Sequence, residues 1–241
     1  MDKGIPDASL KSVKHSLPIQ FKRPDAFTLI ELITVIAIIL VLMGLLFPAV
    51  NSVKQSAWKA QAKNDIVNLV TATKAYYTDY SQYPLNSTQA AWNYNVVYGD
   101  PNGQFSSADL CNILRAIPDA NYNQGNQLNP KLTVFLDLNN VKNPANPRSG
   151  IVTANFKTSN GYNLKPGAYV DPWGDEYVVF IDGSYRGDVS NNGGLNEYFY
   201  WNEQPPLRVR VGVCGVSMGP DRTRGTSGNS IFTGSDDVAT W

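Results

Sequence analysis

The strongest pattern in the sequence is an abrupt change from polar to apolar residues near position 27. Residues 1–26 are polar and carry eight charged side chains, whereas residues 27–50 read FTLIELITVIAIILVLMGLLFPAV and contain only one, Glu31. About 20 predominantly apolar residues are enough for a helix to cross a bilayer. The pattern therefore predicts one transmembrane helix over residues 27–50.

The apolar pattern continues beyond this segment in a weaker form. Small or apolar residues recur at three- and four-residue spacing among lysines and amides; they are Val53, Ala57, Ala60, Ile66, Val67, Val70, Thr73, Ala75 and Tyr77. This spacing is typical of an amphipathic helix. Pro84 disfavours helical geometry in the residue before it. We therefore expect residues 51–84 to continue the same helix and to end it near Tyr80.

The rest of the chain predicts a compact domain over residues 85–241. Asn, Gly and Pro are frequent up to residue 147, with one helix candidate at residues 107–116. Residues 176–182 and 207–216 alternate and are rich in valine, which favours strands. The expected fold class is α+β, with the long helix packed on a small antiparallel sheet that has long loops.

Charge and composition make several classes of function less plausible for this chain. Lys and Arg balance Asp and Glu at 20 each, so no global field favours nucleic acid as a partner. The only histidine is His15, in the polar leader, which argues against histidine-dependent catalysis and His-ligated zinc in the rest of the chain. Cys111 and Cys214 are consistent either with one disulfide or with two buried thiols.

The basic residues before the apolar run predict its orientation. Lys22 and Arg23 favour a cytoplasmic N-terminus, with the C-terminal bulk on the far side of the membrane. A secretory signal peptide would have a shorter apolar stretch, of roughly 7–15 residues, and a small-x-small cleavage site. A plain signal anchor would explain the run but gives no reason for Glu31.

We expect Glu31 to pair with a positive charge, because burying an unpaired carboxylate in hydrocarbon costs at least a few kcal/mol of free energy. No basic residue follows it within twenty positions. Cleavage between Ala26 and Phe27 would create an amino group four residues from Glu31. That amine could pair with the Glu31 carboxylate of a neighbouring copy.

Lys22 to Pro84, with Ala26 followed by Phe-Thr-Leu-Ile-Glu, resembles the class III signal of type IV prepilins and type II secretion pseudopilins. The resemblance implies that a prepilin peptidase removes residues 1–26 and methylates Phe27, and that Glu31 is needed for assembly. The family usually has glycine before the cut, where this chain has Ala26. A small residue should still be processed.

Two further segments resemble the major pseudopilin. Residues 171–177 read DPWGDEY, similar to its Asp-Pro-Trp-Gly-x-x-Tyr segment, and residues 217–221 with 235–241 resemble its calcium loop. Calcium takes six to eight oxygen ligands. We expect one calcium ion held mainly by three carboxylates, with two hydroxyls nearby: Asp221, Asp236, Asp237, Ser217 and Ser235.

The expected function is that of a structural subunit, not an enzyme. The chain would polymerise with itself and other pseudopilins on a secretion platform in the inner membrane, with its domain in the periplasm. An alternative is a type IV pilus subunit, in an extracellular filament, for adhesion, twitching or DNA uptake. A remote alternative is a membrane-anchored hydrolase.

Overall fold

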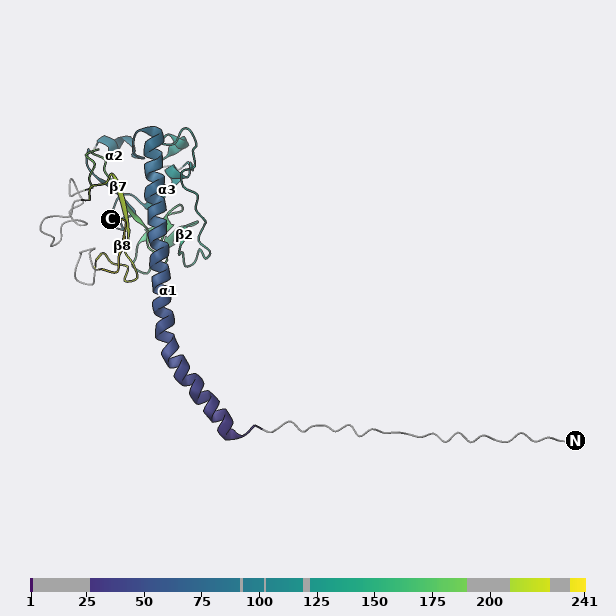
Figure 1. The fold of residues 1–241 in the computed structure, drawn as a ribbon. Helices are drawn as coiled ribbons and strands as arrows, with labels where there is room; N and C mark the ends of the chain where they lie inside the picture. Colours follow the sequence, from purple (N-terminus) through teal and green to yellow (C-terminus); the bar gives the residue numbers. More distant parts are fainter. Residues whose placement is uncertain (2–26, 92, 102, 119–121, 190–208, 226–234) are drawn as a thin grey trace. The chain divides into compact units, whose positions relative to one another are not determined.

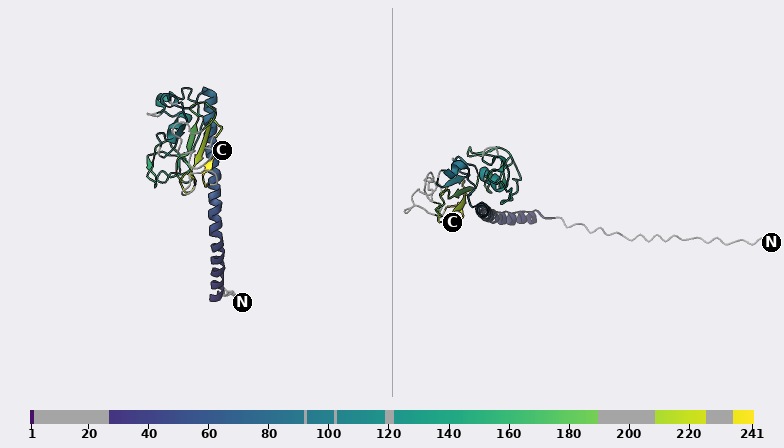
Figure 2. Two further views of the ribbon diagram at one scale, coloured as in Figure 1. Left: turned by 90° about the vertical axis from the view of Figure 1, so that its left-hand side faces the viewer. Right: turned by 90° about the horizontal axis from the view of Figure 1, so that it is seen from above.

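The computed structural model describes residues 1, 27–91, 93–101, 103–118, 122–189, 209–225 and 235–241. These residues form two compact units, Met1–Ala49 and Val50–Trp241. Helix α1 (Leu29–Tyr80) contributes its first part to one unit and its second part to the other. Figure 1 and Figure 2 show its second part running along the C-terminal unit.

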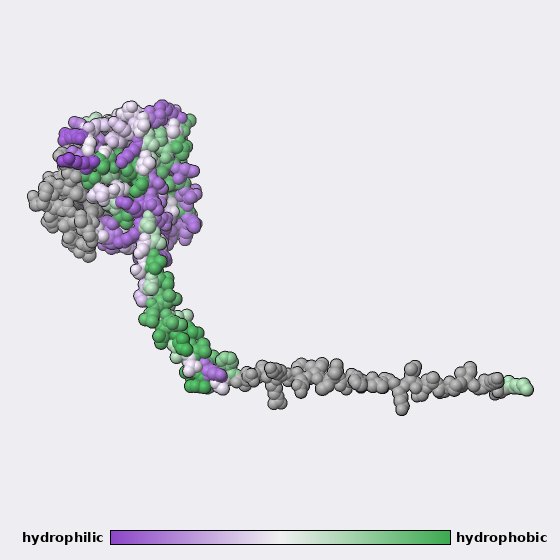
Figure 3. Space-filling model, in the orientation of Figure 1, coloured by the Kyte–Doolittle hydropathy of each residue, from purple (hydrophilic) through white to green (hydrophobic). Residues whose placement is uncertain are grey.

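In the first unit, α1 presents apolar side chains on all sides. Every described residue from Phe27 to Ala49 is exposed, and the space-filling view shows an almost continuous apolar surface there (Figure 3). By length and composition the helix can cross a membrane. A helix that is apolar all round and has no protein around it is typical of a membrane span.

In the second unit, α1 buries one stripe of side chains: Ala62, Ile66, Leu69, Val70, Ala72, Thr73 and Tyr76. The face expected from the sequence was partly wrong, because only Ile66, Val70 and Thr73 of the expected set are buried. Residues such as Val53 and Val67 are exposed, at 69% and 42%. The helix carries two stripes of small and apolar residues, and only one of them meets the sheet.

The sheet that α1 covers is antiparallel, with strand order β1-β6-β7-β8. Its strands are β1 (Val96–Tyr98), β6 (Val178–Ile181), β7 (Val213–Ser217) and β8 (Val238–Ala239). Two ribbons accompany it, made of β2 (Gly150–Ile151) with β5 (Tyr169–Val170) and of β3 (Phe156–Lys157) with β4 (Asn163–Leu164). The described residues of the unit also form three short helices: α2 (Ser87–Ala91), α3 (Ser107–Leu114) and the 3₁₀ turn η1 (Gln124–Asn126).

The sheet has an apolar core on each face. Val179, Ile181 and Val213 pack in the cluster that contains α1, whereas Val178 and Phe180 pack in a second cluster on the other side. Gly215 lets α1 approach β7 closely, since a Cβ there would lie 2.7 Å from Ile66. Together these features confirm the α+β fold, a long helix on a small antiparallel sheet.

Candidate functional site

The start of α1 forms a capping box around Glu31. The Thr28 backbone N–H and hydroxyl both donate to Glu31 Oε2, at 2.8 and 2.7 Å, and the Glu31 N–H donates to Thr28 Oγ1 at 3.3 Å. This exchange satisfies backbone donors that a helix N-terminus leaves unpaired. Sequence reasoning sought a charged partner for Glu31 and missed this local one, although the Thr-x-x-Glu spacing signals it.

The predicted cleavage site lies at the edge of this arrangement. Phe27 precedes the helix and is 78% exposed, while Ala26 lies outside the described residues. Phe27 and Glu31 are separated by four positions, about one helical turn. The arrangement therefore places Phe27, the residue expected to become the N-terminus, one turn before the carboxylate that caps the helix.

The segment at residues 171–177 connects much of the C-terminal unit. Asp171 is fully buried, and its Oδ1 accepts the backbone N–H groups of Trp173, Gly174 and Asp175 at 2.7–3.0 Å. Its Oδ2 accepts the Ser217 hydroxyl at 2.6 Å. Asp171 thus closes its own turn and joins it to the end of β7.

The following side chains reach other elements. Trp173 Nε1 donates to Gln55 on α1 at 3.1 Å, and its ring meets Trp58 edge to face at 6.2 Å between centroids. The Tyr177 hydroxyl donates to Asp65 on α1 at 2.8 Å. Burial raises the pKa of Asp65, although the tyrosine hydrogen bonds oppose that shift. The segment therefore contacts α1 at two positions along the helix, at Gln55 with Trp58 and at Asp65.

Two acidic side chains of the segment hold neighbouring loops. Asp175 binds Arg222 through both carboxylate oxygens, at 2.6 and 2.8 Å. Glu176 accepts the Ser107 N–H at 2.5 Å and the Ser106 hydroxyl at 2.9 Å, at the N-terminus of α3. A carboxylate at this position interacts favourably with the helix dipole.

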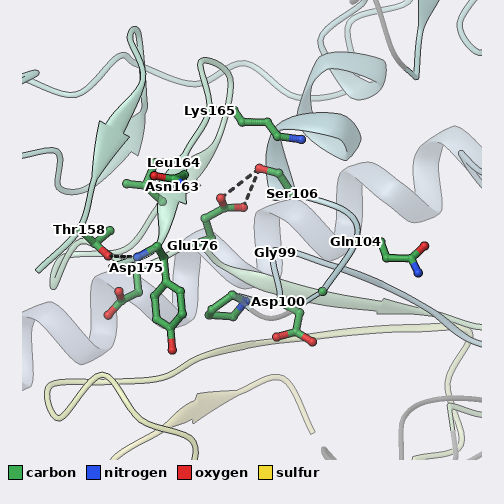
Figure 4. Close-up of a pocket in the computed structure, with 13 residues that line it drawn as sticks. Gly99, Asp100, Gln104, Ser106, Thr158, Asn163, Leu164, Lys165, Asp175 and Glu176 are labelled. Carbon is green, nitrogen blue, oxygen red and sulfur yellow. Dashed lines mark hydrogen bonds between the residues drawn. The ribbon is translucent and has the colours of Figure 1, made fainter. Parts of the chain in front are cut away.

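A pocket opens beside Asp175 and Glu176, between the loop that contains Gly99 and the β3–β4 ribbon (Figure 4). Its lining includes Lys165, whose charge favours the ionised form of Glu176 and so opposes the rise in the pKa of Glu176 that burial causes. Because Asp175 and Glu176 already bind Arg222 and the start of α3, both carboxylates serve the fold.

The two acidic turns of the predicted calcium loop meet in the structure. Gly219 has φ +69°, and a Cβ on it would lie 2.5 Å from the Asp236 carbonyl oxygen, so the turns are in close contact. The Asp221 N–H donates to Asp236 Oδ2 at 3.1 Å. The structure therefore brings together the two turns that the resemblance assigned to one loop, whereas calcium binding there stays a prediction.

Their donor groups fit calcium only in part. Asp237 Oδ2 accepts from Gly225 and Ser235, whereas its buried Oδ1 has no hydrogen-bond partner among the described residues. Burial, with Asp236 and Asp221 nearby, raises the pKa of Asp237 to about 6. Within the described part of the chain, no three acidic, histidine or cysteine side chains are grouped around one metal position.

The two serine hydroxyls expected beside the calcium ion each bind a carboxylate in the structure. The Ser217 hydroxyl donates to Asp171, and the Ser235 hydroxyl donates to Asp237 at 2.8 Å.

Cys111 and Cys214 are both free and buried, so they are not joined in a disulfide. Burial raises the pKa of each thiol, which keeps both in the unreactive protonated form.

One comparison with known proteins identifies part of the chain. Residues 22–47 match the family model described as the prokaryotic N-terminal methylation motif. The matched residues include Ala26, Phe27 and Glu31. No curated protein and no solved structure matches the chain.

Proposed function

We propose that this chain, which carries the N-terminal methylation motif at residues 22–47, is a type IV pilin-like filament subunit and, more specifically, a pseudopilin of a type II secretion system. In this role the subunit polymerises with copies of itself and with other pseudopilins. A prepilin peptidase first removes residues 1–26 and methylates Phe27. The filament grows from a platform in the inner membrane and drives protein export from the periplasm.

The single observation that supports a filament subunit is the methylation motif at residues 22–47 on an exposed apolar helix. The choice of a pseudopilin rests on the resemblance of residues 171–177 and of the acidic turns to the major pseudopilin. Cleavage would leave Phe27 with a charged amine beside the capping box of Glu31. Both charges are expensive in hydrocarbon unless they are paired. A neighbouring copy displaced lengthwise offers the complementary group, so the N-terminus favours assembly over an isolated membrane-embedded subunit.

We also propose that Asp221, Asp236 and Asp237 bind one calcium ion. The meeting of the two turns and the unpaired Oδ1 of Asp237 support this proposal. A calcium ion would supply positive charge near Asp237, whose pKa the charges of Asp236 and Asp221 help to raise. The hydroxyls of Ser217 and Ser235 would supply or orient oxygens at its edge.

The processing step is tested by the intact mass of the protein from its native membrane. The expected mass is that of residues 27–241 with one added methyl group. A chain that still begins at Met1 would contradict the proposal, as would cleavage after Ala49.

The assembly step is tested with Glu31→Ala. The variant should insert into the membrane normally, since a costly charge is removed, but filaments should disappear from electron micrographs. Thr34→Ala is the matched control, because among the described residues the Thr34 hydroxyl donates to the helix carbonyls of Ile30 and Glu31 and to no other group. Normal filament yield from Glu31→Ala would show that the carboxylate serves another purpose.

The kind of filament is tested by deleting the chain. Loss of export, with secreted proteins retained in the periplasm, is the result expected for a pseudopilin. Normal export with loss of adhesion, twitching or DNA uptake would identify a surface pilus instead.

A further inference from the structure

The first turns of α1 in the C-terminal unit carry exposed apolar side chains next to an exposed lysine. Val50 is 53% exposed and Val53 is 69% exposed, and Lys54 is exposed as well. Residues three and four positions apart are neighbours on a helix surface. Val50, Lys54 and Trp58 therefore follow one face of α1, with Val53 beside them.

Trp58 connects this face to the core of the unit. Its ring packs against the hydrophobic cluster on the α1 side of the sheet and meets Trp173 edge to face. The Lys54 Nζ atom lies 4.6 Å from the centroid of the Trp58 ring, which is within the range of a cation–π contact. The Lys54 ammonium group is therefore held beside a ring that the core keeps in place.

A second cation reaches the same place from another loop. Arg148 is exposed, and its Nη1 atom donates to the carbonyl of Pro172 at 3.1 Å. The next residue, Trp173, contacts α1 at Trp58. Within the described part of the chain, neither Lys54 nor Arg148 forms an ion pair. We call the five residues on this surface the basal patch: Val50, Val53, Lys54, Trp58 and Arg148.

Carboxylates close to the basal patch are engaged elsewhere. Between Glu31 and Asp65 the sequence contains no acidic residue. In the turn that holds Trp173, Asp171 is fully buried and accepts hydrogen bonds from its own turn, and Asp175 is paired with Arg222. These carboxylates do not cancel the charges of the two exposed cations.

The acidic turns meet α1 further along the helix. The Lys63 ammonium group donates to the carbonyl of Ala239, next to those turns. Lys63 is nine residues beyond Lys54, which corresponds to about 14 Å along a helix. Lys63 is therefore engaged with the C-terminal strand and is not part of the basal patch.

The basal patch directly follows the apolar run on the same helix. The run ends at Val50, and Lys54 is four residues later, about 6 Å along the helix axis. In a helix that crosses the bilayer over residues 27–50, Lys54 lies at the level of the lipid headgroups. Tryptophan is enriched at this level, and lysine can lay its stem along apolar surface while its ammonium group stays in the polar layer.

We propose that the basal patch binds anionic phospholipids, with Lys54 and Arg148 contacting the phosphate groups and Val50 and Val53 at the edge of the hydrocarbon. The inference rests on the proposed membrane-anchored subunit and adds the surface through which its C-terminal unit contacts the bilayer before assembly. Two observations select the membrane as the partner. The patch is continuous with the apolar helix, and anionic headgroups complement the two exposed cations.

Native mass spectrometry of the full chain tests this contact. The chain is released from nanodiscs that contain equal amounts of phosphatidylglycerol and phosphatidylcholine, and the lipids that remain bound are counted. The unmodified chain should retain phosphatidylglycerol in excess. Lys54→Gln together with Arg148→Gln should reduce that excess by about fivefold or more, whereas Lys54→Arg, which keeps the charge, should preserve it.

Lys74→Gln is the matched control, because Lys74 is an exposed lysine of the same helix, about 30 Å beyond Lys54. It should leave the phosphatidylglycerol excess unchanged; an equal loss in this control would mean that only net charge matters and would overturn the contact. An anchored chain that retains both lipids equally would also overturn the contact and leave the filament proposal standing. So would a double variant with normal lipid retention and reduced filament yield, which would assign the patch to a second copy of the chain. A chain that does not stay in the nanodisc would overturn both proposals.

Discussion

At the residue scale, the segment at residues 171–177 shows why a recognisable motif need not be catalytic. Each of its acidic side chains is bound by protein donors: Asp171 by its own turn, Asp175 by Arg222 and Glu176 by the start of α3. Buried carboxylates are tolerated when hydrogen bonds or ion pairs satisfy them. The motif therefore encodes a junction between elements.

Asp65 gives a prediction at this scale. Asp65→Ala removes the acceptor of the buried Tyr177 hydroxyl, and we expect a loss of about 1–3 kcal/mol in the free energy of unfolding of the C-terminal unit. Asp65→Asn keeps an oxygen acceptor and should lose much less. Urea unfolding followed by circular dichroism measures both. Equal losses in the two variants would show that the hydrogen bond is not what matters.

The same residue predicts a pH dependence. Because burial raises the pKa of Asp65, the folded state holds this proton more tightly than the unfolded state. The stabilisation is fully present below the ordinary aspartate pKa of 3.8 and is lost as the pH rises through the folded-state pKa. As the pH is raised from the ordinary aspartate pKa of 3.8 toward neutrality, the unmodified unit should lose a stabilising contribution from Asp65, and Asp65→Asn should lack this loss. An unchanged difference in the variant would assign the pH dependence to other groups.

At the element scale, hydrophobic pattern predicted α1 well and its buried face poorly. The apolar run and the proline after Tyr80 marked a helix that the structure places at Leu29–Tyr80. The face could not be predicted because Val53 and Val67 are as apolar as Ile66 and Val70, and only the position of the sheet decides between them. The predicted helix at residues 107–116 is α3, which begins at Ser107 with Ser106 as its cap.

Helix α3 gives a prediction at the element scale. Glu176→Ala removes the acceptor for Ser106 and Ser107, and we expect a loss of about 1–3 kcal/mol in the free energy of unfolding. Glu176→Gln keeps an acceptor but loses the charge that favours the helix N-terminus, so its loss should be smaller. Asp137→Ala, at an exposed carboxylate, should change the urea midpoint little. A midpoint for Glu176→Ala that equals this control would rule out a capping role.

At the scale of the whole molecule, residue spacing in the sequence predicts local arrangements but does not predict contacts between distant segments. Thr28 and Glu31 are three positions apart, so their capping box was available to inspection of the sequence. The stacking of Tyr83 on Tyr185 was not, because Tyr185 comes near Tyr83 through the pairing of β6 with β1 and through a loop in which Asp182 Oδ2 accepts the Gly187 N–H. The contact between the two acidic turns was expected because of a resemblance to a known family. Their separation in the sequence alone gives no reason to pair them.

The acidic turns decide how the whole C-terminal unit should respond to calcium. Residues 217–241 contain few large apolar side chains, so burial alone offsets little of the backbone entropy of ordering them, roughly 1–2 kcal/mol per residue. An ion that binds only the folded state stabilises it by mass action, by about 2.7 kcal/mol at a hundredfold excess over its dissociation constant. The unit Val50–Trp241 should therefore melt at a higher temperature in millimolar calcium than in chelator.

Variants assign this effect to the turns. Asp237→Ala or Asp221→Ala should abolish the difference between calcium and chelator, whereas Asp137→Ala should keep it. The difference should also shrink as the pH falls below about 6, the raised pKa of Asp237, because a protonated carboxyl is a poor calcium ligand. Differential scanning calorimetry of the unmodified unit is the decisive measurement. Identical melting curves with calcium and with chelator would mean that the turns are held together by their own hydrogen bonds and by the Arg222–Asp175 pair, without a metal ion.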